Sequence, residues 1–350
     1  MSNLAENKLD LIDNSIKDIG DLLDDGLIIT NRSGFIVSAN DASREFLGKN
    51  LINQNITTFI KSKEFTNLVS KKFNENVDKE FFYQMDDVLK RSLSIRIKKL
   101  SNELIVILLL DMTLQRNLEK VRRDFVANVS HELRSPLTSL VGFIETLLSD
   151  NDIDQKSRQK FLNIMDEEAK RMNRLIDDIL SLSKVETEEH ITPSTSLSIL
   201  DPIKSVISSL DERGLSKNNK ISLINKSLDP TKPIYIIGNY DEITQVFTNL
   251  LENAIKYGYE NSEIIVEVEK NKNKEITVII TNEGEGIPQK YLERLTERFF
   301  RVDKARSRKI GGTGLGLAIV KHILIRHRAT LSIDSELNKK TSITINFPSV

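Results

Sequence analysis

The chain has 350 residues, and its 50 basic and 51 acidic side chains leave a net charge of −1. This length predicts two or three domains, and the balanced charge excludes a general electrostatic attraction to nucleic acid or to an acidic membrane. The absence of cysteine excludes disulfides, thiolate metal sites and cysteine nucleophiles, and it suits a reducing interior.

The longest unbroken apolar run is LIVILLL at residues 104–110, far shorter than the roughly 20 residues needed to span a bilayer. We interpret this run as a buried strand and expect no transmembrane segment in this chain. The first residues contain neither a basic region nor an apolar run, so they do not resemble a secretory signal. We expect a cytoplasmic protein that could reach a membrane only through a partner or through a segment removed before Met1.

The pattern divides the chain into five segments, at residues 1–20, 21–112, 113–187, 188–197 and 198–350. The first segment has apolar residues at helical spacing and predicts an N-terminal helix. The second opens on two short β-rich runs separated by the turn NRSG, continues through a helical stretch and ends in further β-prone runs. This order resembles an α+β PAS sensor domain, and a small α+β spacer without a ligand is the alternative.

The third segment predicts two long helices. Apolar residues recur at three- and four-residue steps from Leu114 to Leu147 and again from Phe161 to Leu180, with the polar turn SDNDID between the two rows. An antiparallel hairpin of this kind leaves apolar surface uncovered, and a second copy would cover it in a four-helix bundle. We therefore expect a homodimer. A polar linker that contains Pro193 follows.

The last segment alternates helices and strands, which predicts an α/β sandwich with a mixed sheet under helices. In the stretch NLLENAIKYG, Asn249, Asn253 and Lys256 recur at four- and three-residue steps, on one face of a helix whose other face is apolar. Amide oxygens suit Mg²⁺, and an ammonium group suits phosphate. This row therefore indicates a site for phosphate with a bound metal.

Two glycine-rich stretches of the last segment point the same way. In NEGEGIP, Gly284 and Gly286 would let the backbone approach a flat ligand closely. In GGTGLGLAIV, glycines open a helix, where free N–H groups favour phosphate. The second pattern is not a P-loop, because it lacks the Gly-Lys-Ser/Thr ending, and its glycine spacing is not that of a Rossmann fingerprint.

His131 and Glu132 are neighbours in the helical stretch SHELRSP. An isolated pair of this kind is ordinarily a chance surface feature. A neutral imidazole is nevertheless a competent nucleophile near neutral pH, and a glutamate that accepts its other proton would make it more nucleophilic. Pro136 removes one helix hydrogen bond, so we expect a bend just after the histidine. The remaining histidines, which we expect in surface or packing roles, are His190, His322 and His327.

The stretches HELRSP, NLLENAIKY, NEGEGI, ERFFRVD and GTGLGLAIVKHI, in this order, resemble the H, N, G1, F and G2 boxes of the sensor histidine kinases of two-component signalling. The resemblance covers residues 124–347 and implies a GHKL-type ATP-binding fold for the last segment. Residues 292–324 are especially similar to the phosphate-regulon sensor kinases of the PhoR type.

The resemblance implies that His131 Nε2 attacks the γ-phosphorus of ATP and later passes the phosphoryl group to an aspartate of a response regulator, PhoB-like for the PhoR type. Glu132 would orient or accept the Nδ1 proton of the histidine. Ser135 stands at a position that relatives use to place water for dephosphorylation of the regulator, although many carry threonine or asparagine there. The implied partners are this regulator and a second copy of the chain, with no nucleic acid.

ATP and Mg²⁺ are the implied cofactors. Asn253 would ligate Mg²⁺ with help from Asn249, Lys256 would contact phosphate, and Tyr257 would lie against the adenine ring. Gly284 and Gly286 would shape the adenine pocket. The residues expected to flank the phosphates and a mobile lid over about residues 298–313 are Gly312, Gly314 and Gly316, and those expected to anchor the lid against the helical hairpin are Phe299 and Phe300.

The G1 box departs from the family pattern at its first position. Relatives carry an aspartate there, which accepts a hydrogen bond from the adenine amino group, and this chain has Asn282. An amide oxygen can still accept the bond without the charge, so we expect weaker ATP binding than in a relative with aspartate, and tighter binding in Asn282→Asp.

Two other functions remain open on the sequence. A phosphatase-dominant or scaffold homologue would bind a regulator and use ATP weakly. A relative of the gyrase and Hsp90 ATPases would need a general-base glutamate four residues before the metal-binding asparagine, where this chain has Asn249. The sequence leaves open the signal, any ligand of the PAS-like segment, the regulator, and whether phosphorylation occurs within one chain or across a dimer.

Overall fold

The structure is a computed structural model, and it forms two compact units, Met1–Val126 and Ala127–Val350. It describes residues 20–71, 78–85, 90–99, 104–149, 153–212, 219–227, 232–270, 275–303 and 312–348. The expected N-terminal helix lies outside the described residues except for Gly20, and so does the part of the expected lid at residues 304–311. Among the described helices, none combines the length and the apolar character needed to cross a membrane.

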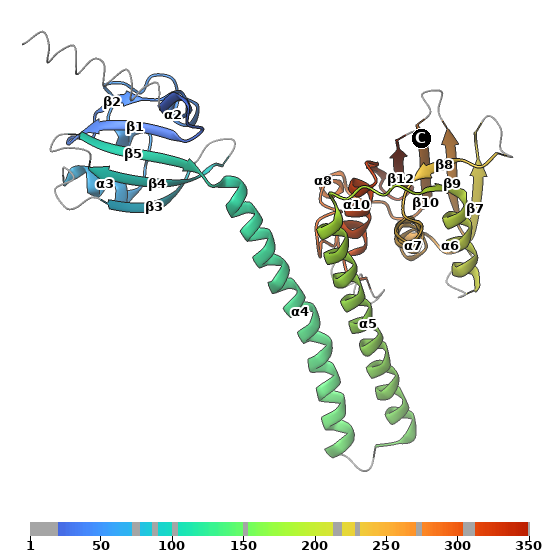
Figure 1. Ribbon diagram of the computed structural model, residues 1–350. Coiled ribbons are helices and arrows are strands. Elements are labelled where there is room, and N and C mark those ends of the chain that lie inside the picture. The colour runs from blue at the N-terminus through green and yellow to red at the C-terminus, as the bar shows by residue number, and fades with distance from the viewer. Residues whose placement is uncertain are drawn as a thin grey trace, which may run out of the picture. The chain divides into compact units, whose positions relative to one another are not determined.

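The first unit is built on a five-stranded antiparallel sheet in the order β2-β1-β5-β4-β3 (Figure 1). Its strands are β1 Gly26–Asn31, β2 Ile36–Ala39, β3 Asp78–Gln84, β4 Ser92–Lys99 and β5 Leu104–Asp111. Its short helices are α2 Asp41–Leu47, η1 Ile56–Thr58 and α3 Lys63–Ser70. The expected hairpin is confirmed, because β1 pairs with β2 antiparallel.

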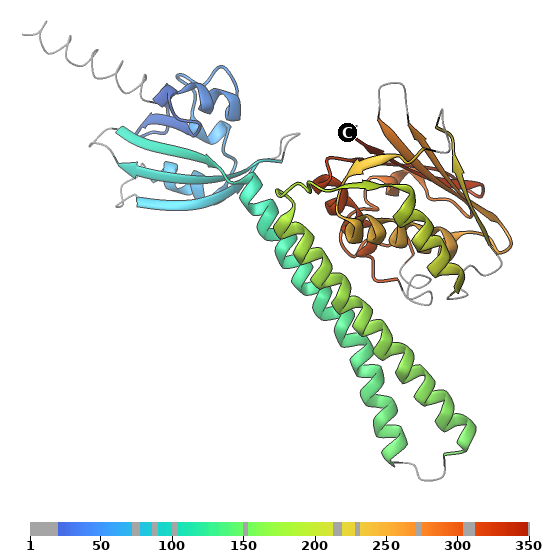
Figure 2. The same ribbon diagram turned by 45° about the vertical axis from the view of Figure 1, so that its right-hand side comes forward.

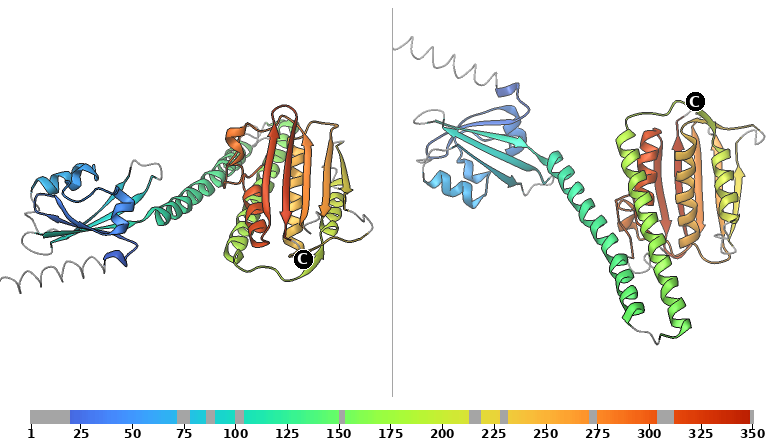
Figure 3. Two further views of the ribbon diagram at one scale, coloured as in Figure 1. Left: turned by 90° about the horizontal axis from the view of Figure 1, so that it is seen from above. Right: turned by 60° about the horizontal axis from the view of Figure 1, so that its bottom comes forward.

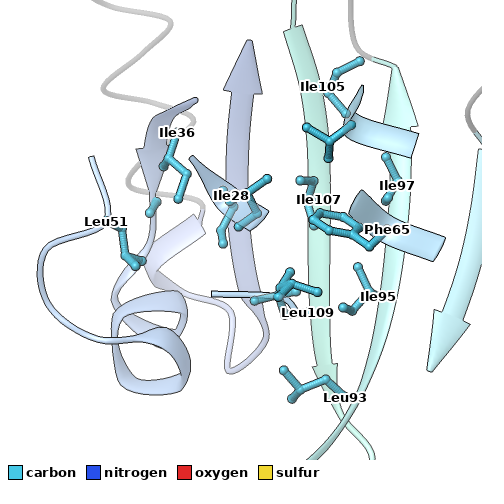
Figure 4. Close-up of a cluster of buried hydrophobic side chains, with 14 of the residues drawn as sticks. Ile28, Ile36, Leu51, Phe65, Leu93, Ile95, Ile97, Ile105, Ile107 and Leu109 are labelled. Atoms are coloured by element: carbon cyan, nitrogen blue, oxygen red, sulfur yellow. The ribbon is translucent and has the colours of Figure 1, made fainter. Parts of the chain in front are cut away.

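The apolar run at residues 104–110 forms β5, between β1 and β4. Ile105, Ile107 and Leu109 are fully buried in the core of the first unit, where Phe65 and Ile28 pack with them (Figure 4). The alternate residues of the run are only partly buried. The prediction of a buried strand is therefore correct for one face of β5, as expected when successive side chains point to opposite faces of a sheet.

Asn40 fixes the start of α2 against β1. Its Oδ1 accepts hydrogen bonds from the backbone N–H of Ser43 at 3.0 Å and of Leu27 at 2.8 Å. Its Nδ2 donates to the carbonyls of Gly20 at 2.7 Å and Asp25 at 2.9 Å. The side chain is only 3% exposed, so it satisfies backbone groups that water does not reach.

The helical hairpin consists of α4 Thr113–Ser149, which crosses the boundary between the two units, and α5 Gln155–Glu188. In the second unit, α4 and α5 run side by side (Figure 2), and the rings of Phe143 and Phe161 lie 5.2 Å apart between them. Asp154 caps α5 by accepting from two backbone N–H groups. Pro136 lies inside α4, which continues through it as one helix.

The rest of the second unit is an α/β sandwich with a five-stranded sheet in the order β11-β12-β10-β9-β7. β7 pairs with β9 in parallel and the other pairs are antiparallel, so the expected mixed sheet is confirmed. The strands are β7 Lys220–Asn225, β9 Glu263–Lys270, β10 Ile276–Glu283, β11 Thr330–Glu336 and β12 Lys340–Phe347. The helices are α6 Leu200–Glu212, α7 Tyr240–Tyr257, α8 Gln289–Leu292 and α10 Gly316–Arg326.

The helices α6, α7 and α10 lie over one face of this sheet, and α5 runs along α10 (Figure 3). A separate two-stranded ribbon pairs β6 Ser196–Ser198 with β8 Tyr235–Ile237. β6 falls at the end of the segment that we predicted as linker. Three residues are too few to show the alternating pattern of a strand. The pairing with β8 supplies the backbone hydrogen bonds of β6.

α7 is held in place by its apolar face. Asn239 caps its first turn, accepting from the N–H groups of Asp241 and Glu242. The buried side chains of α7 include Ile243, Val246, Phe247, Leu250, Leu251, Ala254 and Ile255. Because these residues recur at helical spacing, the polar residues between them must face away from the core.

We expect Asn40→Ala to lower the free energy of unfolding of the first unit by about 2 kcal/mol, because it removes a helix cap and leaves buried backbone groups without partners. Urea unfolding of the full chain, followed by circular dichroism, measures the change. The matched control is Asn67→Ala in α3, where the side chain is exposed and a change within about 0.5 kcal/mol is expected. Equal effects in both variants would contradict the assigned role.

Candidate functional site

A cavity of about 580 Å³ opens in the second unit between α7, α5, the sheet and the loops that follow β10. The residues that line it come from six helices and strands and from the loops between them: Arg174, Asp177 and Asp178 of α5; Gln245, Thr248, Asn249, Leu250, Glu252, Asn253, Ala254, Lys256 and Tyr257 of α7; Ile280 and Asn282 of β10; Gly316 and Leu317 of α10; Ile333 of β11; Thr341 and Ile343 of β12; and Leu295, 285–287, 300–303 and 312–314 in the loops. A volume of this size is that of a small-molecule site.

The structure brings nearly all of the expected nucleotide-binding residues into this one cavity. The expected residues that line it are Asn249, Asn253, Lys256, Tyr257, Asn282, Gly286, Gly312, Gly314 and Gly316. Gly284 lies between Asn282 and Gly286 in the sequence, but it is not among the described residues that line the cavity. Stretches more than 60 residues apart in the chain therefore meet at one site, as the order of the motifs suggested.

The polar row of α7 faces the beginning of α10. Lys256 Nζ lies 2.8 Å from Glu252 Oε2, which holds the ammonium group at the wall of the cavity. A Cβ on Gly316, the first residue of α10, would lie 2.9 Å from Asn249 Oδ1. Glycine is therefore needed at this position so that the amides of α7 can approach the first turn of α10. That turn has no side-chain cap among the described residues, and its free N–H groups favour an anion.

The glycines of the G1 box lie where the protein's own backbone segments approach closely. A Cβ on Gly284 would lie 2.5 Å from the carbonyl oxygen of Tyr257, and a Cβ on Gly286 would overlap the carbonyl oxygen of Glu336. Gly286 also has a φ of +69°, which side chains disfavour. The close approach of backbone to backbone joins β10 to the end of α7 and to the β11–β12 turn, and the expected approach to a flat ligand stays a prediction.

The two ends of the expected lid are joined to each other. Phe299 N donates to the carbonyl of Gly314 at 2.8 Å, and a Cβ on Gly314 would lie 3.0 Å from Phe299 Cα. Phe300 lines the cavity, and its ring packs 5.9 Å from Tyr291 and under the guanidinium of Arg294. These contacts anchor Phe300 within its own domain, and the expected anchoring against the helical hairpin stays a prediction.

Asn282 and Thr341 form the polar end of the cavity over the sheet. Asn282 is 8% exposed, and its Nδ2 donates to the carbonyl of Glu283 at 3.3 Å. Thr341 stands opposite Asn282 in the register of β10 and β12, and its hydroxyl lies 2.8 Å from the hydroxyl of Ser335. The sequence analysis missed Thr341, because it begins an ordinary alternating strand and only the strand pairing brings it to the site.

α5 contributes a partly buried carboxylate that was not predicted from the sequence. Asp178 Oδ2 accepts a hydrogen bond from Thr313 Oγ1 at 2.6 Å. Burial raises the pKa of the Asp178 carboxyl above its usual range, and the hydrogen bond from Thr313 opposes this shift. Nothing in the local sequence of α5 marks Asp178, because its partner lies more than 130 residues further on.

His131 and Ser135 lie one turn apart on α4, and both are exposed. His131 is absent from the described residues that line the cavity. Glu132 faces the other way, and its Oε2 accepts from Arg171 Nη2 at 2.9 Å and from Arg301 Nη2 at 3.3 Å. The expected role of Glu132 toward His131 stays a prediction, because two arginines hold its carboxylate in this arrangement.

Arg301 connects α4, the helix that carries His131, to the cavity. Its side chain is 6% exposed and lines the cavity, while its Nη2 reaches Glu132. Burial lowers the pKa of the Arg301 guanidinium, and the charge of Glu132 opposes this shift. The sequence analysis named neither Arg171 nor Arg301, although the latter stands inside the F box.

Further polar contacts hold α10 against the end of α5. His322 Nδ1 lies 2.7 Å from Glu189 Oε2, and His322 Nε2 lies 3.3 Å from Glu186 Oε1. Arg326 donates to the carbonyl of Ile191 at 2.8 Å. The packing role expected for His327 is confirmed, since it is 4% exposed and accepts from the backbone N–H of Asn239 at 3.0 Å.

Comparisons with known proteins agree with this geometry. Residues 238–350 match the family model of the histidine kinase-, DNA gyrase B- and HSP90-like ATPases, and residues 121–188 match that of the His Kinase A phospho-acceptor domain. The sensor protein kinase WalK of Staphylococcus aureus is 33% identical over 335 residues, which cover 93% of this chain and 79% of that protein. The chain belongs to the sensor histidine kinases.

Two further relatives bear on the subfamily. The sensor histidine kinase WalK of Bacillus subtilis is 33% identical over 333 residues, covering 93% of this chain and 53% of that protein. The phosphate regulon sensor protein PhoR of Pseudomonas aeruginosa is 39% identical over 243 residues, covering 69% of this chain and 53% of that protein. The chain thus spans about half the length of these curated relatives, and the similarity does not separate the PhoR type from the WalK type.

The histidine kinase ThkA, whose crystal structure was solved in complex with the response regulator protein TrrA, has the same fold. The TM-score is 0.52 at 22% identity, and the alignment covers 93% of this chain and 96% of ThkA. A helical phospho-acceptor domain followed by a GHKL-type ATPase domain is therefore the fold of this sensor kinase as well.

We expect Asp178→Asn to raise the melting temperature of the chain when it is measured above pH 7. Because the pKa of the Asp178 carboxyl is raised in the folded state, the folded protein binds this proton more readily than the unfolded chain, whose pKa is about 3.9. The partly buried carboxylate therefore costs stability at pH 7 to 8, and the cost disappears as the pH falls to about 4. The amide can still accept the hydrogen bond from Thr313.

Thermal unfolding of the full chain between pH 4 and 8 measures this effect. The matched control is Glu167→Gln, which removes an exposed carboxylate of the same helix and should show no such dependence. A melting-temperature difference for Asp178→Asn that stays constant across the pH range would show that burial of the charge is not its cause.

Proposed function

We propose that the chain is an ATP-dependent protein-histidine kinase that autophosphorylates His131 from Mg²⁺-ATP and transfers the phosphoryl group to an aspartate of a response regulator. The observation that carries this proposal is the cavity of about 580 Å³, which gathers the N, G1 and G2 residues and also includes α5 and Arg301 in its wall. A nucleotide site is thereby linked, through Glu132, to the helix that exposes His131.

The donor groups suit Mg²⁺ that arrives with a nucleotide. Among the described residues, no group of three or more His, Cys, Asp or Glu is placed to hold a metal ion. Asn249 and Asn253 would supply amide oxygens, and the phosphates would supply the remaining charge. Lys256 and the first turn of α10 would neutralise the phosphates, and Gly312, Gly314 and Gly316 would let the backbone approach them.

The adenine ring would lie over the sheet between Tyr257 and the side chains of Ile280, Ile333 and Ile343, which line the cavity. Asn282 would accept a hydrogen bond from the adenine amino group. Gly284 would act indirectly by keeping β10 close to the end of α7. These assignments rest on the matching motifs and on the shared cavity.

The transfer itself forms a bond between His131 Nε2 and the γ-phosphorus and breaks the bond from that phosphorus to the β,γ-bridging oxygen, which leaves with ADP. Such a reaction depends on in-line placement and charge neutralisation. Since His131 does not line the described cavity, the ATP domain must reposition, or the cavity of the partner protomer must serve. In either case Glu132 would leave its arginines and turn toward the Nδ1 proton of His131.

The regulator is proposed on the relatives. ThkA, which shares the fold, was crystallised with the response regulator protein TrrA. Identity of 39% to PhoR supports phosphate-regulon-type signalling with a PhoB-like regulator as the finer proposal. A phosphotransfer profile, in which the labelled chain is offered a set of purified regulators, tests the choice between a PhoB-like partner and a partner of the WalK type.

A homodimer is proposed on the exposed apolar rows of the hairpin. On α4, Leu137, Val141, Ile144 and Leu148 recur at four- and three-residue steps and are 43 to 78% exposed. On α5, Leu162, Ile176 and Leu180 are 42 to 63% exposed. Water-exposed apolar rows of this length are covered in a four-helix bundle by a second hairpin.

The first unit is proposed as a PAS-like sensor domain over residues 21–112. Its strand order β2-β1-β5-β4-β3 and the short helices between β2 and β3 support this reading. Its core is filled by apolar side chains, so a spacer without a ligand remains the alternative.

A phosphatase-dominant or scaffold homologue is the second candidate function, because Asn282 replaces the aspartate of the family at the base end of the cavity. An ATPase of the gyrase and Hsp90 type is disfavoured, since Asn249 stands where those enzymes need a general base.

We expect incubation with γ-labelled ATP and Mg²⁺ to give an acid-labile, base-stable label that His131→Ala loses entirely, because an N–P bond hydrolyses in acid. The matched control is His190→Ala, which also removes an exposed histidine and should keep the label. No label on the unchanged chain would support the scaffold, and label that survives in His131→Ala would contradict the assignment of the phosphoacceptor.

We expect Ile144→Glu to weaken dimerisation by at least about 100-fold, because an unpaired carboxylate would enter an apolar interface. Sedimentation at micromolar concentration measures the mass, and circular dichroism checks that the helices persist. Glu145→Gln alters the exposed neighbouring residue and should remain dimeric. A dimer of unchanged affinity in Ile144→Glu would place the interface elsewhere.

A further inference from the structure

Two polar side chains, Asn282 and Thr341, lie at the end of the cavity where we propose that the base binds, which we call the base end. Each of them can either donate or accept a hydrogen bond. Asn282 Nδ2 donates to the carbonyl of Glu283 at 3.3 Å, and its Oδ1 has no hydrogen-bond partner among the described residues. At 8% exposure the amide is more than nine-tenths buried, and it lines the cavity. A ligand that reaches this amide therefore meets an acceptor that has no partner among the described residues.

We propose that this cavity accepts 6-oxopurine nucleotides as well as adenine nucleotides, and that Asn282 is the residue that permits both. The inference rests on the proposed function and concerns the substrate class of the same site. Adenine presents an amino donor at its 6 position, whereas guanine and hypoxanthine present a carbonyl acceptor there. A carboxylate has only acceptors and would select the amino group, but an amide has an acceptor at one end and a donor at the other.

The Asn282 amide can turn over at a small cost in binding free energy. In the observed orientation Oδ1 is free to accept from a 6-amino group. If the amide turns over, Nδ2 can donate to a 6-oxo group, and the turn gives up only the hydrogen bond to Glu283. At 3.3 Å that bond is long. Loss of one such bond corresponds to about tenfold or less in affinity.

Thr341 adapts in the same way. It lies opposite Asn282 in the strand register and lines the cavity. Its hydroxyl shares a 2.8 Å hydrogen bond with the hydroxyl of Ser335, in which either oxygen can donate. Ser335 in turn accepts from the N–H of Ile287 at 2.9 Å and donates to the carbonyl of Lys340 at 3.1 Å, so that Thr341 donates to Ser335 in this arrangement. Turning the Ser335 hydroxyl from Lys340 to Thr341 would reverse the pair. A hydroxyl that can reverse its role can face the N1 acceptor of adenine or the N1–H of a 6-oxopurine.

The remaining walls of this end do not choose between the two bases. Ile280, Ile333 and Ile343 offer apolar surface to either ring. Discrimination between purines is strong only where a site leaves a buried polar group unpaired with the wrong ligand. Here each purine finds a partner for its 6 position, so selectivity for adenine should be modest.

Calorimetric titration of the full chain with Mg²⁺-ATP and with Mg²⁺-ITP tests the inference. ITP carries the 6-oxo group and the N1–H of guanine without its 2-amino group, so it probes the 6 position alone. We expect ITP to bind about tenfold more weakly than ATP. Binding more than about 100-fold weaker would overturn the proposal, and this measurement needs no variant.

Asn282→Asp then assigns the effect to the residue. We expect it to tighten ATP and to increase the ratio of the ITP to the ATP dissociation constant by more than about tenfold, because a carboxylate would face the 6-oxo group. The matched control is Thr281→Val, next to it on β10, whose hydroxyl lies 3.0 Å from that of Ser342 rather than in the cavity. Its ratio should equal that of the unchanged chain.

The outcomes separate the two proposals. If ATP binds and labels His131 while ITP is excluded, or if the ratio is the same in Asn282→Asp, the inference on base selectivity is wrong and the kinase function stands. If neither nucleotide binds, the proposed function itself fails.

Discussion

The two-sided character of α7 is the constraint on which the second unit depends. One side of this helix is fully committed to the core, with Val246, Phe247 and Leu250 at 0% exposure. The other side is thereby turned to the cavity, where Asn249, Asn253 and Lys256 are presented. Because the apolar face sets the rotation of the helix, a change in the core would displace the whole polar row.

Glycines allow neighbouring elements to approach closely around the cavity, because a side chain at these positions would clash. Gly316 brings the start of α10 onto the amide of Asn249, and Gly284 brings β10 onto the end of α7. Both contacts are between parts of the protein. The cavity is therefore shaped before any ligand arrives, which reduces the ordering cost of binding.

The contacts between the helical hairpin and the ATPase domain hold Glu132 and Asp178 away from His131, the proposed phosphoacceptor, in this arrangement. Glu132 is bound by Arg171 and Arg301, and Asp178 by Thr313. The arginines are 13% and 6% exposed, so these ion pairs are little screened by water. They compete directly with the role proposed for Glu132 beside His131.

The sequence by itself determined most of the elements, their order and most of the residues that meet at the site, although it gave no sign of β6 or α8. Periodicity fixed both long helices and α7, and the motifs marked Asn249, Asn253, Lys256 and Gly316, because an amphipathic pattern and a glycine before a helix are local features. The start of α5 at Gln155, ahead of the first apolar residue of its row, followed from the cap at Asp154. Only the tertiary structure decided which side chains face one another across large separations. Thr341 reached the site through strand register, Asp178 and Arg171 through the packing of α5, and Glu132 turned to two arginines instead of to its neighbour. These contacts depend on how separate elements pack, and no local pattern in the chain encodes that packing.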